Sequence, residues 1–173
     1  PFSETNDELV ENQQENESKK EEIPLKINSE IQGSYSEKDK SLTILIIEDN
    51  YELRTFLKNL LNQYYKVVTS PNGKQGLETA LTILPDLVIS DVMMPQMDGL
   101  EVCRQLKNDI QSSHIPVILL TALNDSEEQV GGFLIGADAY ITKPFDENIL
   151  LARINNLIRS RAKLRELFSV SDS

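Results

Sequence analysis

The sequence predicts an α/β fold in which helices cover both faces of a parallel β-sheet. Five short apolar runs, rich in β-branched residues, alternate with segments whose apolar residues repeat at helical spacing. The runs are apolar without alternation, which is typical of strands buried on both faces of a parallel sheet. The expected strands are residues 43–47, 65–69, 87–90, 116–120 and 139–141.

The segments between these strands carry the signals of crossover helices. Asn50 is a plausible N-cap for a helix whose apolar residues follow at helical spacing. These residues are Leu53, Phe56, Leu57, Leu60 and Leu61. Pro71-Asn72-Gly73 punctuates the turn after the second strand. Further helices are expected through residues 76–81, 100–106, 126–135 and 147–168. Right-handed crossovers then limit the topology to a few arrangements.

Residues 1–40 have a different composition from the remainder. They contain 11 acidic and 5 basic residues, a net charge of −6, and few apolar groups. Such a segment buries too little apolar surface to offset the entropy of ordering. We therefore expect an acidic, mostly disordered linker at 1–40, a folded domain at 41–160, and an extension of the last helix at 161–173.

The bulk composition argues against several classes of function. The net charge of −11 disfavours a nucleic-acid-binding surface, which needs clustered Lys and Arg. The apolar runs fall far short of the ~20 residues that span a bilayer, and no signal peptide is visible. A single cysteine, Cys103, cannot form an internal disulfide, so a cytoplasmic location is expected. The chain begins at Pro1 rather than Met, which suggests a piece of a longer protein.

Polar residues follow or end four of the five expected strands. Glu48 and Asp49 follow the first strand, Asp91 the third, Thr121 the fourth, and Lys143 lies just past the fifth. In a parallel sheet, the carboxyl ends of all strands lie along one edge, which is where open α/β sheets bind ligands. These five residues are therefore expected to share one pocket.

The charges in that pocket predict a metal ion and phosphoryl chemistry. Two carboxylates ~4 Å apart repel by ~4 kcal/mol at an effective dielectric near 20, so three together need a cation. Hard oxygen ligands with room for water suit Mg²⁺. A metal ion and Lys143 beside Asp91 could neutralise an incoming phosphoryl group. Asp91 would then be the nucleophile and would form an acyl phosphate.

With their neighbours, these residues resemble the receiver domain of two-component signalling. The motifs are Glu48-Asp49, Asp91 within DVMMPQMDG, Thr121-Ala122 and Lys143-Pro144-Phe145. The order, strand placement and spacing of these motifs match that family over about residues 42–160. Glu rather than Asp at position 48 is a mild departure that should leave metal binding intact.

The resemblance implies that Asp91 is the phosphoacceptor. Asp49 and Asp91 would bind Mg²⁺ together with the backbone carbonyl of Met93, and Glu48 would act partly through a metal-bound water. A histidine kinase would be the phosphodonor. This segment would then be a phosphoacceptor rather than an enzyme that turns over.

The same resemblance implies how the phosphoryl group is held and sensed. The Thr121 hydroxyl and the backbone amides of Val92 and Ala122 would hold the phosphoryl oxygens, and Lys143 would pair with them. Phosphorylation would draw the Thr121 hydroxyl inward, and the aromatic ring of Tyr140 would turn into the vacated space.

The implied fold is a flavodoxin-like (βα)5 three-layer sandwich with strand order 2-1-3-4-5. Its signalling face would consist of helix 126–135, strand 139–141 and helix 147–168. Lys143-Pro144 is a candidate cis peptide, since X-Pro bonds alone take that form cheaply.

The flanks resemble receivers of hybrid two-component sensors of Bacteroidetes type. The stretches are SHIPVILLTA and LLARINNLIRSRAKLRELFS. In that arrangement a histidine kinase, which can be membrane-anchored, precedes the receiver, and an AraC-type DNA-binding output domain often follows. Residues 1–40 would be the kinase–receiver linker, and phosphorylation could drive dimerisation. A stand-alone response regulator is the alternative.

Two other classes of function compete with a phosphoacceptor switch. A Mg²⁺-dependent phosphatase of the haloacid-dehalogenase type also uses an aspartyl phosphate, but its DxDx(T/V) pattern follows the first strand. A pure interaction module with a vestigial site is the second competitor.

Each residue also has a plainer interpretation when taken alone. Asp49 would be a helix cap, Thr121 a strand-end hydroxyl, Tyr140 a packing residue and Lys143 a surface charge. Asp98-Gly99 is expected to form a turn or a helix start rather than to catalyse.

Overall fold

The computed structural model describes residues 40–122 and 135–169 of the 173-residue chain. It contains a five-stranded parallel sheet in the order β2-β1-β3-β4-β5. The strands are β1 (Thr43–Ile47), β2 (Lys66–Ser70), β3 (Leu87–Asp91), β4 (Val117–Ala122) and β5 (Ala139–Lys143). The expected flavodoxin-like fold and its strand order are confirmed.

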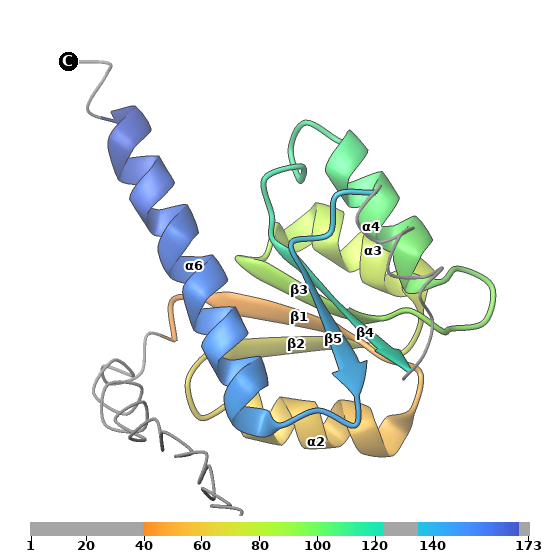
Figure 1. Ribbon diagram of the computed structural model, residues 1–173. Coiled ribbons are helices and arrows are strands. Elements are labelled where there is room, and N and C mark those ends of the chain that lie inside the picture. Colours follow the sequence, from red (N-terminus) through yellow and green to blue (C-terminus); the bar gives the residue numbers. More distant parts are fainter. Residues whose placement is uncertain (1–39, 123–134, 170–173) are drawn as a thin grey trace, which may run out of the picture.

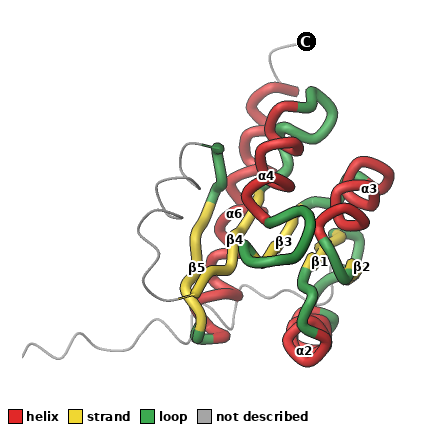
Figure 2. The backbone as a smooth tube through the Cα atoms, turned by 90° about the vertical axis from the view of Figure 1, so that its right-hand side faces the viewer, coloured by secondary structure: helices red, strands yellow, loops and turns green. Residues whose placement is uncertain are grey.

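Helices cover both faces of this sheet (Figure 1). The described helices are α2 (Tyr51–Leu61), α3 (Gly73–Ile83), α4 (Gly99–Asn108) and α6 (Glu147–Ser169). α2 and α6 pack on one face, and α3 and α4 on the other. The turned view shows α3 and α4 above the strands and α2 below them (Figure 2). The helix expected at 126–135 lies outside the described residues, apart from Ile135.

Successive residues of the central strands point into two separate cores, one on each side of the sheet. In β1, Ile44 and Ile46 pack with α2 and α6, whereas Leu45 and Ile47 pack with α3 and α4. All four are fully buried. This two-sided burial explains why the strand sequences are apolar without alternation.

The loops at the carboxyl edge of the sheet are fixed by helix N-caps. The side-chain oxygens of Asn50, Asn72 and Asp98 accept hydrogen bonds from backbone N–H groups in the first turns of α2, α3 and α4. Capping of this kind stabilises a helix start by about 1 kcal/mol. The expected cap at Asn50 is confirmed, and Asp98-Gly99, expected to be a turn or a helix start, begins α4. Asn72, expected within a turn, is the N-cap of α3.

The last two strands are longer than the sequence suggested. β4 reaches Ala122 and β5 reaches Lys143, because these two residues pair in the ladder between the strands. Lys143 is therefore the last residue of a strand rather than a residue beyond it, and the peptide bond to Pro144 is cis, as expected.

α6 is the longest described helix and extends past the sheet (Figure 1). Its first half buries Leu150, Leu151 and Ile154 against the sheet. Leu164 and Phe168 near its end are 52% and 71% exposed. No helix among the described residues is long and apolar enough to cross a membrane.

Candidate functional site

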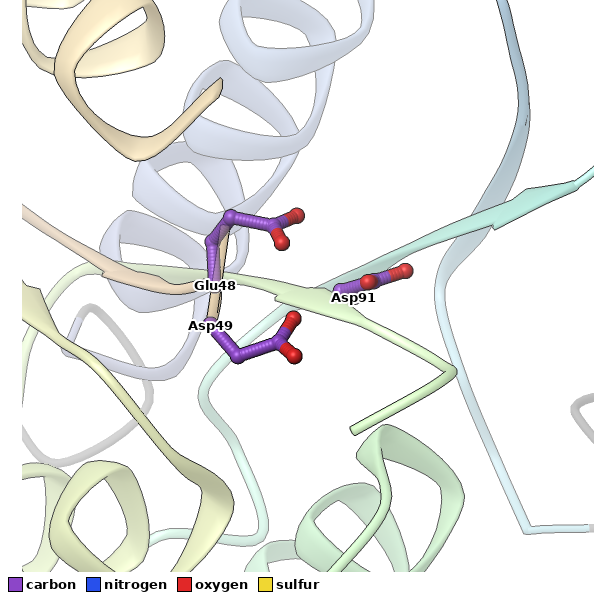
Figure 3. A group of neighbouring side chains, drawn as sticks. All are labelled: Glu48, Asp49 and Asp91. Atoms are coloured by element: carbon purple, nitrogen blue, oxygen red, sulfur yellow. The ribbon is translucent and has the colours of Figure 1, made fainter. Parts of the chain in front are cut away.

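Three carboxyl groups meet at the carboxyl edge of the sheet, as the sequence predicted. Glu48 and Asp49 follow β1, and Asp91 is the last residue of the neighbouring strand β3. One carboxylate oxygen from each residue lies within 4.8 Å of the other two. Figure 3 shows the three side chains extending toward the same side from the ends of these strands.

Two of the three carboxyl groups are buried. Glu48 is 1% and Asp91 5% exposed, whereas Asp49 is exposed. Glu48 Oε1 accepts a hydrogen bond of 3.0 Å from the backbone N–H of Asn50. Among the described residues, no donor makes a well-directed hydrogen bond to Glu48 Oε2 or to Asp91 Oδ1. These two oxygens are therefore held in the pocket with lone pairs to offer a ligand.

Lys143 supplies a positive charge to the same pocket. Its Nζ forms ion pairs with Asp91 Oδ1 at 3.0 Å and with Glu48 Oε2 at 3.8 Å. The lysine side chain is 28% exposed and reaches inward from the end of β5. One ammonium group faces three carboxyl groups, so the pocket keeps an excess of negative charge.

The burial and the charges of this pocket favour the protonated form of Glu48. Burial raises the pKa of this carboxyl group to about 7, and the neighbouring charge of Asp91 acts in the same direction. The Asn50 N–H and Lys143 oppose the increase without cancelling it. A cation near Glu48 would favour its ionised form.

The pocket fits a small divalent cation of the Mg²⁺ type. Its donors are hard carboxylate oxygens from Glu48, Asp49 and Asp91. Two of these oxygens are buried and accept no hydrogen bond from the described residues, and Asp49 leaves the site open to water. Mg²⁺ prefers such ligands and retains several waters when bound.

The hydroxyl and aromatic residues expected beside the pocket lie on β4 and β5. Thr121 is 1% exposed, and its Oγ1 lies 3.4 Å from the carbonyl oxygen of Ala122 in a long hydrogen bond. Tyr140 is half-buried and packs against the core on the α3 and α4 side of the sheet. In the ladder, Tyr140 pairs with Leu119, two residues before Thr121.

The Val92 amide, one of the expected phosphoryl ligands, makes a hydrogen bond within the sheet. The backbone N–H of Val92 donates a 2.9 Å hydrogen bond to the Leu120 carbonyl, which continues the pairing of β3 with β4. The role expected for the Val92 amide, which is to hold a phosphoryl oxygen, stays a prediction. The next residue, Met93, is 63% exposed, and its backbone N–H and carbonyl form no hydrogen bond with the described residues.

The structure also identifies supporting residues that the sequence did not single out. Arg54 Nη1, from α2, donates to the backbone carbonyls of Glu48 at 2.7 Å and Asp49 at 3.2 Å. The sequence shows Arg54 only as a charge four residues after the Asn50 cap. A Cβ on Gly99 would lie 2.0 Å from the Asp91 carbonyl oxygen, so α4 approaches the strand end closely.

The remaining chemically distinctive residues lie apart from the pocket. Cys103 is fully buried in the α3 and α4 core, as expected. His114 is exposed in the loop before β4.

Comparisons with known proteins agree with this geometry. A family model described as "Response regulator receiver domain" matches residues 44–155. The chain is 44% identical to histidine kinase P4 of Formosa agariphila over 149 residues, covering 86% of this chain and 11% of that protein. It is 41% identical to the response regulator PleD of Caulobacter vibrioides over 128 residues, covering 73% of this chain and 28% of that protein.

Solved structures show the same likeness. The signal receiver domain of a signal transduction histidine kinase from Syntrophus aciditrophicus matches with a TM-score of 0.65 and 39% identity. That match covers 68% of this chain and 90% of the other.

Proposed function

Because the chain belongs to the response regulator receiver domain family, we propose that it accepts a phosphoryl group on Asp91 from a histidine kinase. One observation carries the proposal: Asp91 is 5% exposed, yet its Oδ1 lies 3.0 Å from Lys143 Nζ beside two further carboxyl groups. A buried acid among charged partners in a pocket is typical of a reactive group.

The transfer is a nucleophilic displacement at phosphorus. A carboxylate oxygen of Asp91 attacks the phosphorus atom of a phosphohistidine, so a P–O bond forms while the P–N bond breaks. The imidazole leaves with the electron pair of the broken bond and takes up a proton. Lys143 balances the charge that spreads over the phosphoryl oxygens.

Asp49, Asp91 and the Met93 carbonyl would hold Mg²⁺, with Glu48 acting through a bound water. When bound, Mg²⁺ supplies charge neutralisation between the carboxylates and the phosphoryl oxygens. The exposed position of Asp49 and the open carbonyl of Met93 support this ligand set. The Thr121 hydroxyl and the backbone amides of Val92 and Ala122 would hold the phosphoryl oxygens.

The output step is a shift of Thr121 and Tyr140. Movement of the Thr121 hydroxyl toward the phosphoryl group would let Tyr140 turn inward and change the face made by β5, α6 and residues 126–135. That face would control an output domain, with AraC-type DNA binding and regulation of transcription as the proposed outcome. Phosphorylation-dependent dimerisation is part of the same proposal.

The parent protein is proposed to be a hybrid sensor, with a histidine kinase before residue 1 and the output domain after Ser173. The 44% identity to a histidine kinase supports it. The chain spans only 11% of that relative, so the domain composition of the parent protein must be determined from the parent gene. A stand-alone response regulator is the alternative, and the sequence of the gene on both sides of this segment separates the two.

Phosphorylation by a small donor tests the function. The chain is mixed with Mg²⁺ and acetyl phosphate, and its intact mass is followed over time. We expect the mass of one phosphoryl group to be gained by the native chain and by Asp98→Asn, but not by Asp91→Asn. Asp98→Asn is the matched control because it removes an exposed acid of the adjacent loop and keeps a good helix cap.

Three outcomes would contradict the proposal. Equal phosphate uptake by the native chain and Asp91→Asn would place the acceptor elsewhere. If neither the native chain nor Asp91→Asn gained phosphate, with acetyl phosphate or with the cognate kinase, the domain would be an interaction module with a vestigial site. Repeated turnover of phosphomonoesters would instead indicate a phosphatase.

A further inference from the structure

A second charged site lies at the opposite, amino-terminal edge of the sheet. A cavity of about 150 Å³ is lined by residues of α6, of the segment entering β1 and of the segment before β3. Its lining consists of Leu42, Asp86, Ile158, Arg161, Ala162 and Arg165. The floor is apolar, because Leu42 and Ile158 pack against the core on the α2 and α6 side.

The two arginines bring positive charge to this cavity without a matching ion pair. Arg161 is half-buried and Arg165 exposed, and among the described residues neither lies within ion-pair distance of an acid. The acid of the lining, Asp86, accepts a 2.8 Å hydrogen bond from the Thr43 N–H. Burial and the Arg165 charge lower the pKa of Arg161, although the charges of Asp138 and Asp86 oppose the decrease. Burial and the two arginine charges also lower the pKa of His114.

Charge is distributed unevenly along the chain in a way that matches this cavity. α6 carries five basic and two acidic residues, a net charge of +3, in a chain whose net charge is −11. Residues 4–17 carry six acidic and no basic residues. That acidic segment belongs to the stretch that enters the fold at Leu42, which lines the cavity.

We propose that the acidic segment 4–17 of the same chain docks onto the cavity lined by Arg161 and Arg165. Its carboxylates would pair with the two guanidinium groups, and its apolar side chains would contact Leu42 and Ile158. The contact would hold residues 4–17, which precede the folded domain, against α6.

Chain length permits this contact. Twenty-four residues, 18–41, lie between position 17 and Leu42. A chain of that length spans at most roughly 80 Å when fully extended. The stretch of α6 from Ile158 to Ser169 is roughly 17 Å long at 1.5 Å per residue. A tethered segment that can reach its site binds at a high effective concentration, so weak ion pairs suffice.

Paramagnetic relaxation in the full chain tests the proposal. A nitroxide label on Gln13→Cys lies within the acidic segment and leaves every charge in place. Native Cys103 is buried, and the chain without Gln13→Cys verifies that it takes no label. At low salt we expect the amide signals of Leu42 and of residues 158–166 to lose most of their intensity. They should recover at about 0.5 M NaCl, where the Debye length is roughly 4 Å.

Two matched variants locate the contact on one side of α6. Arg161→Gln/Arg165→Gln should abolish the broadening, whereas Arg159→Gln/Lys163→Gln should retain it with the same change in net charge. The amide shifts of the sheet verify that both variants fold.

No broadening in the native chain, or equal loss in both variants, would overturn the proposal. A mixture of unlabelled ¹⁵N chain and spin-labelled ¹⁴N chain distinguishes the second possible occupant. Broadening of equal strength in that mixture would mean that the segment of another copy docks, and it too would overturn the proposal.

Discussion

The Nζ atom of Lys143 lies 3.0 Å from Asp91 Oδ1 and 3.8 Å from Glu48 Oε2, and it thereby joins the ends of three strands. In the sheet order, β4 separates β5 from β3, and β3 and β4 separate β5 from β1. The lysine side chain therefore reaches across one strand to Asp91 and across two to Glu48. Both acceptor oxygens are buried and accept no well-directed hydrogen bond from the described residues. The contact is therefore electrostatic, and a phosphoryl group on Asp91 could replace it.

Lys143→Met should separate metal binding from phosphoryl transfer. Removing the ammonium charge leaves the carboxylates more negative, so Mg²⁺ should bind at least as tightly as to the native chain. Phosphorylation by acetyl phosphate should slow by about a hundredfold, because one group that stabilises the developing charge is lost. Calorimetric titration and intact-mass kinetics measure the two effects.

Lys74→Met, which changes an exposed lysine of α3, is the control and should alter neither quantity. If the Lys143→Met chain lost Mg²⁺ affinity in step with its phosphorylation rate, Lys143 would act only by shaping the pocket.

Glu48→Gln should stabilise the metal-free protein. The folded-state pKa of Glu48 is about 7 against an ordinary value of 4.5, so its ionised form opposes folding. The loss of folding stability caused by ionised Glu48 is absent below pH 4.5, where the carboxyl group is protonated in both the folded and the unfolded protein. The loss is fully present above pH 7. In EDTA, the gain from Glu48→Gln should grow over that window to on the order of 1–2 kcal/mol at pH 8.

Thermal unfolding across this pH range measures the effect. Glu101→Gln is the control with the opposite sign, because the Arg104 side chain holds the pKa of Glu101 down to about 2. An unfolding midpoint at pH 8 that is lower for Glu48→Gln than for the native chain in EDTA would refute the electrostatic interpretation.

Cys103 should resist alkylation while the protein is folded. Burial raises the pKa of its thiol to about 11, so only about one molecule in a thousand carries the reactive thiolate at pH 8. Reaction with iodoacetamide should therefore be over a hundredfold slower than for an exposed thiol, and it should become fast in urea. The Ser113→Cys variant, in the exposed loop before β4, supplies the exposed thiol for comparison. Equal rates at the two positions would contradict the burial of Cys103.

The site was predictable where strand topology alone places a residue. Asp49, Asp91 and Lys143 lie far apart in the sequence, yet parallel strands must bring their ends to one edge. The pocket therefore followed from reading the strands correctly, even though the ends of β4 and β5 were placed too early. Strand ends depend on the pairing of Ala122 with Lys143, which a single sequence does not reveal.

Contacts that depend on three-dimensional register were not predictable. The Val92 amide donates to Leu120 because β3 and β4 pair in one particular alignment. Phe56 repeats at helical spacing with buried leucines, but it is 42% exposed because it lies at the border of the apolar face of α2. Arg54 is visible in the sequence as a charge, whereas its hydrogen bonds to two carbonyls depend on the shape of the loop after β1.

Gly99→Ala should damage both the fold and the proposed phosphoacceptor site. The added methyl group would lie 2.0 Å from the Asp91 carbonyl oxygen and 3.0 Å from Ser90 Oγ, so the strand end or α4 must move. Overpacking of this kind costs about 1–3 kcal/mol. The movement would also displace Asp91 relative to Lys143, and phosphorylation by acetyl phosphate should fall well below the native rate even at temperatures where the variant is folded.

Gly136→Ala separates lost stability from lost function. Gly136 has a φ of +84°, which an alanine adopts at a cost of about 1–2 kcal/mol, but the nearest atom to its added methyl group is 3.6 Å away on Lys107. This variant should unfold at a lower temperature and still accept phosphate at the native rate. Because both substitutions add one methyl group, native-rate phosphorylation of Gly99→Ala would show that the close approach of α4 to β3 does not position Asp91.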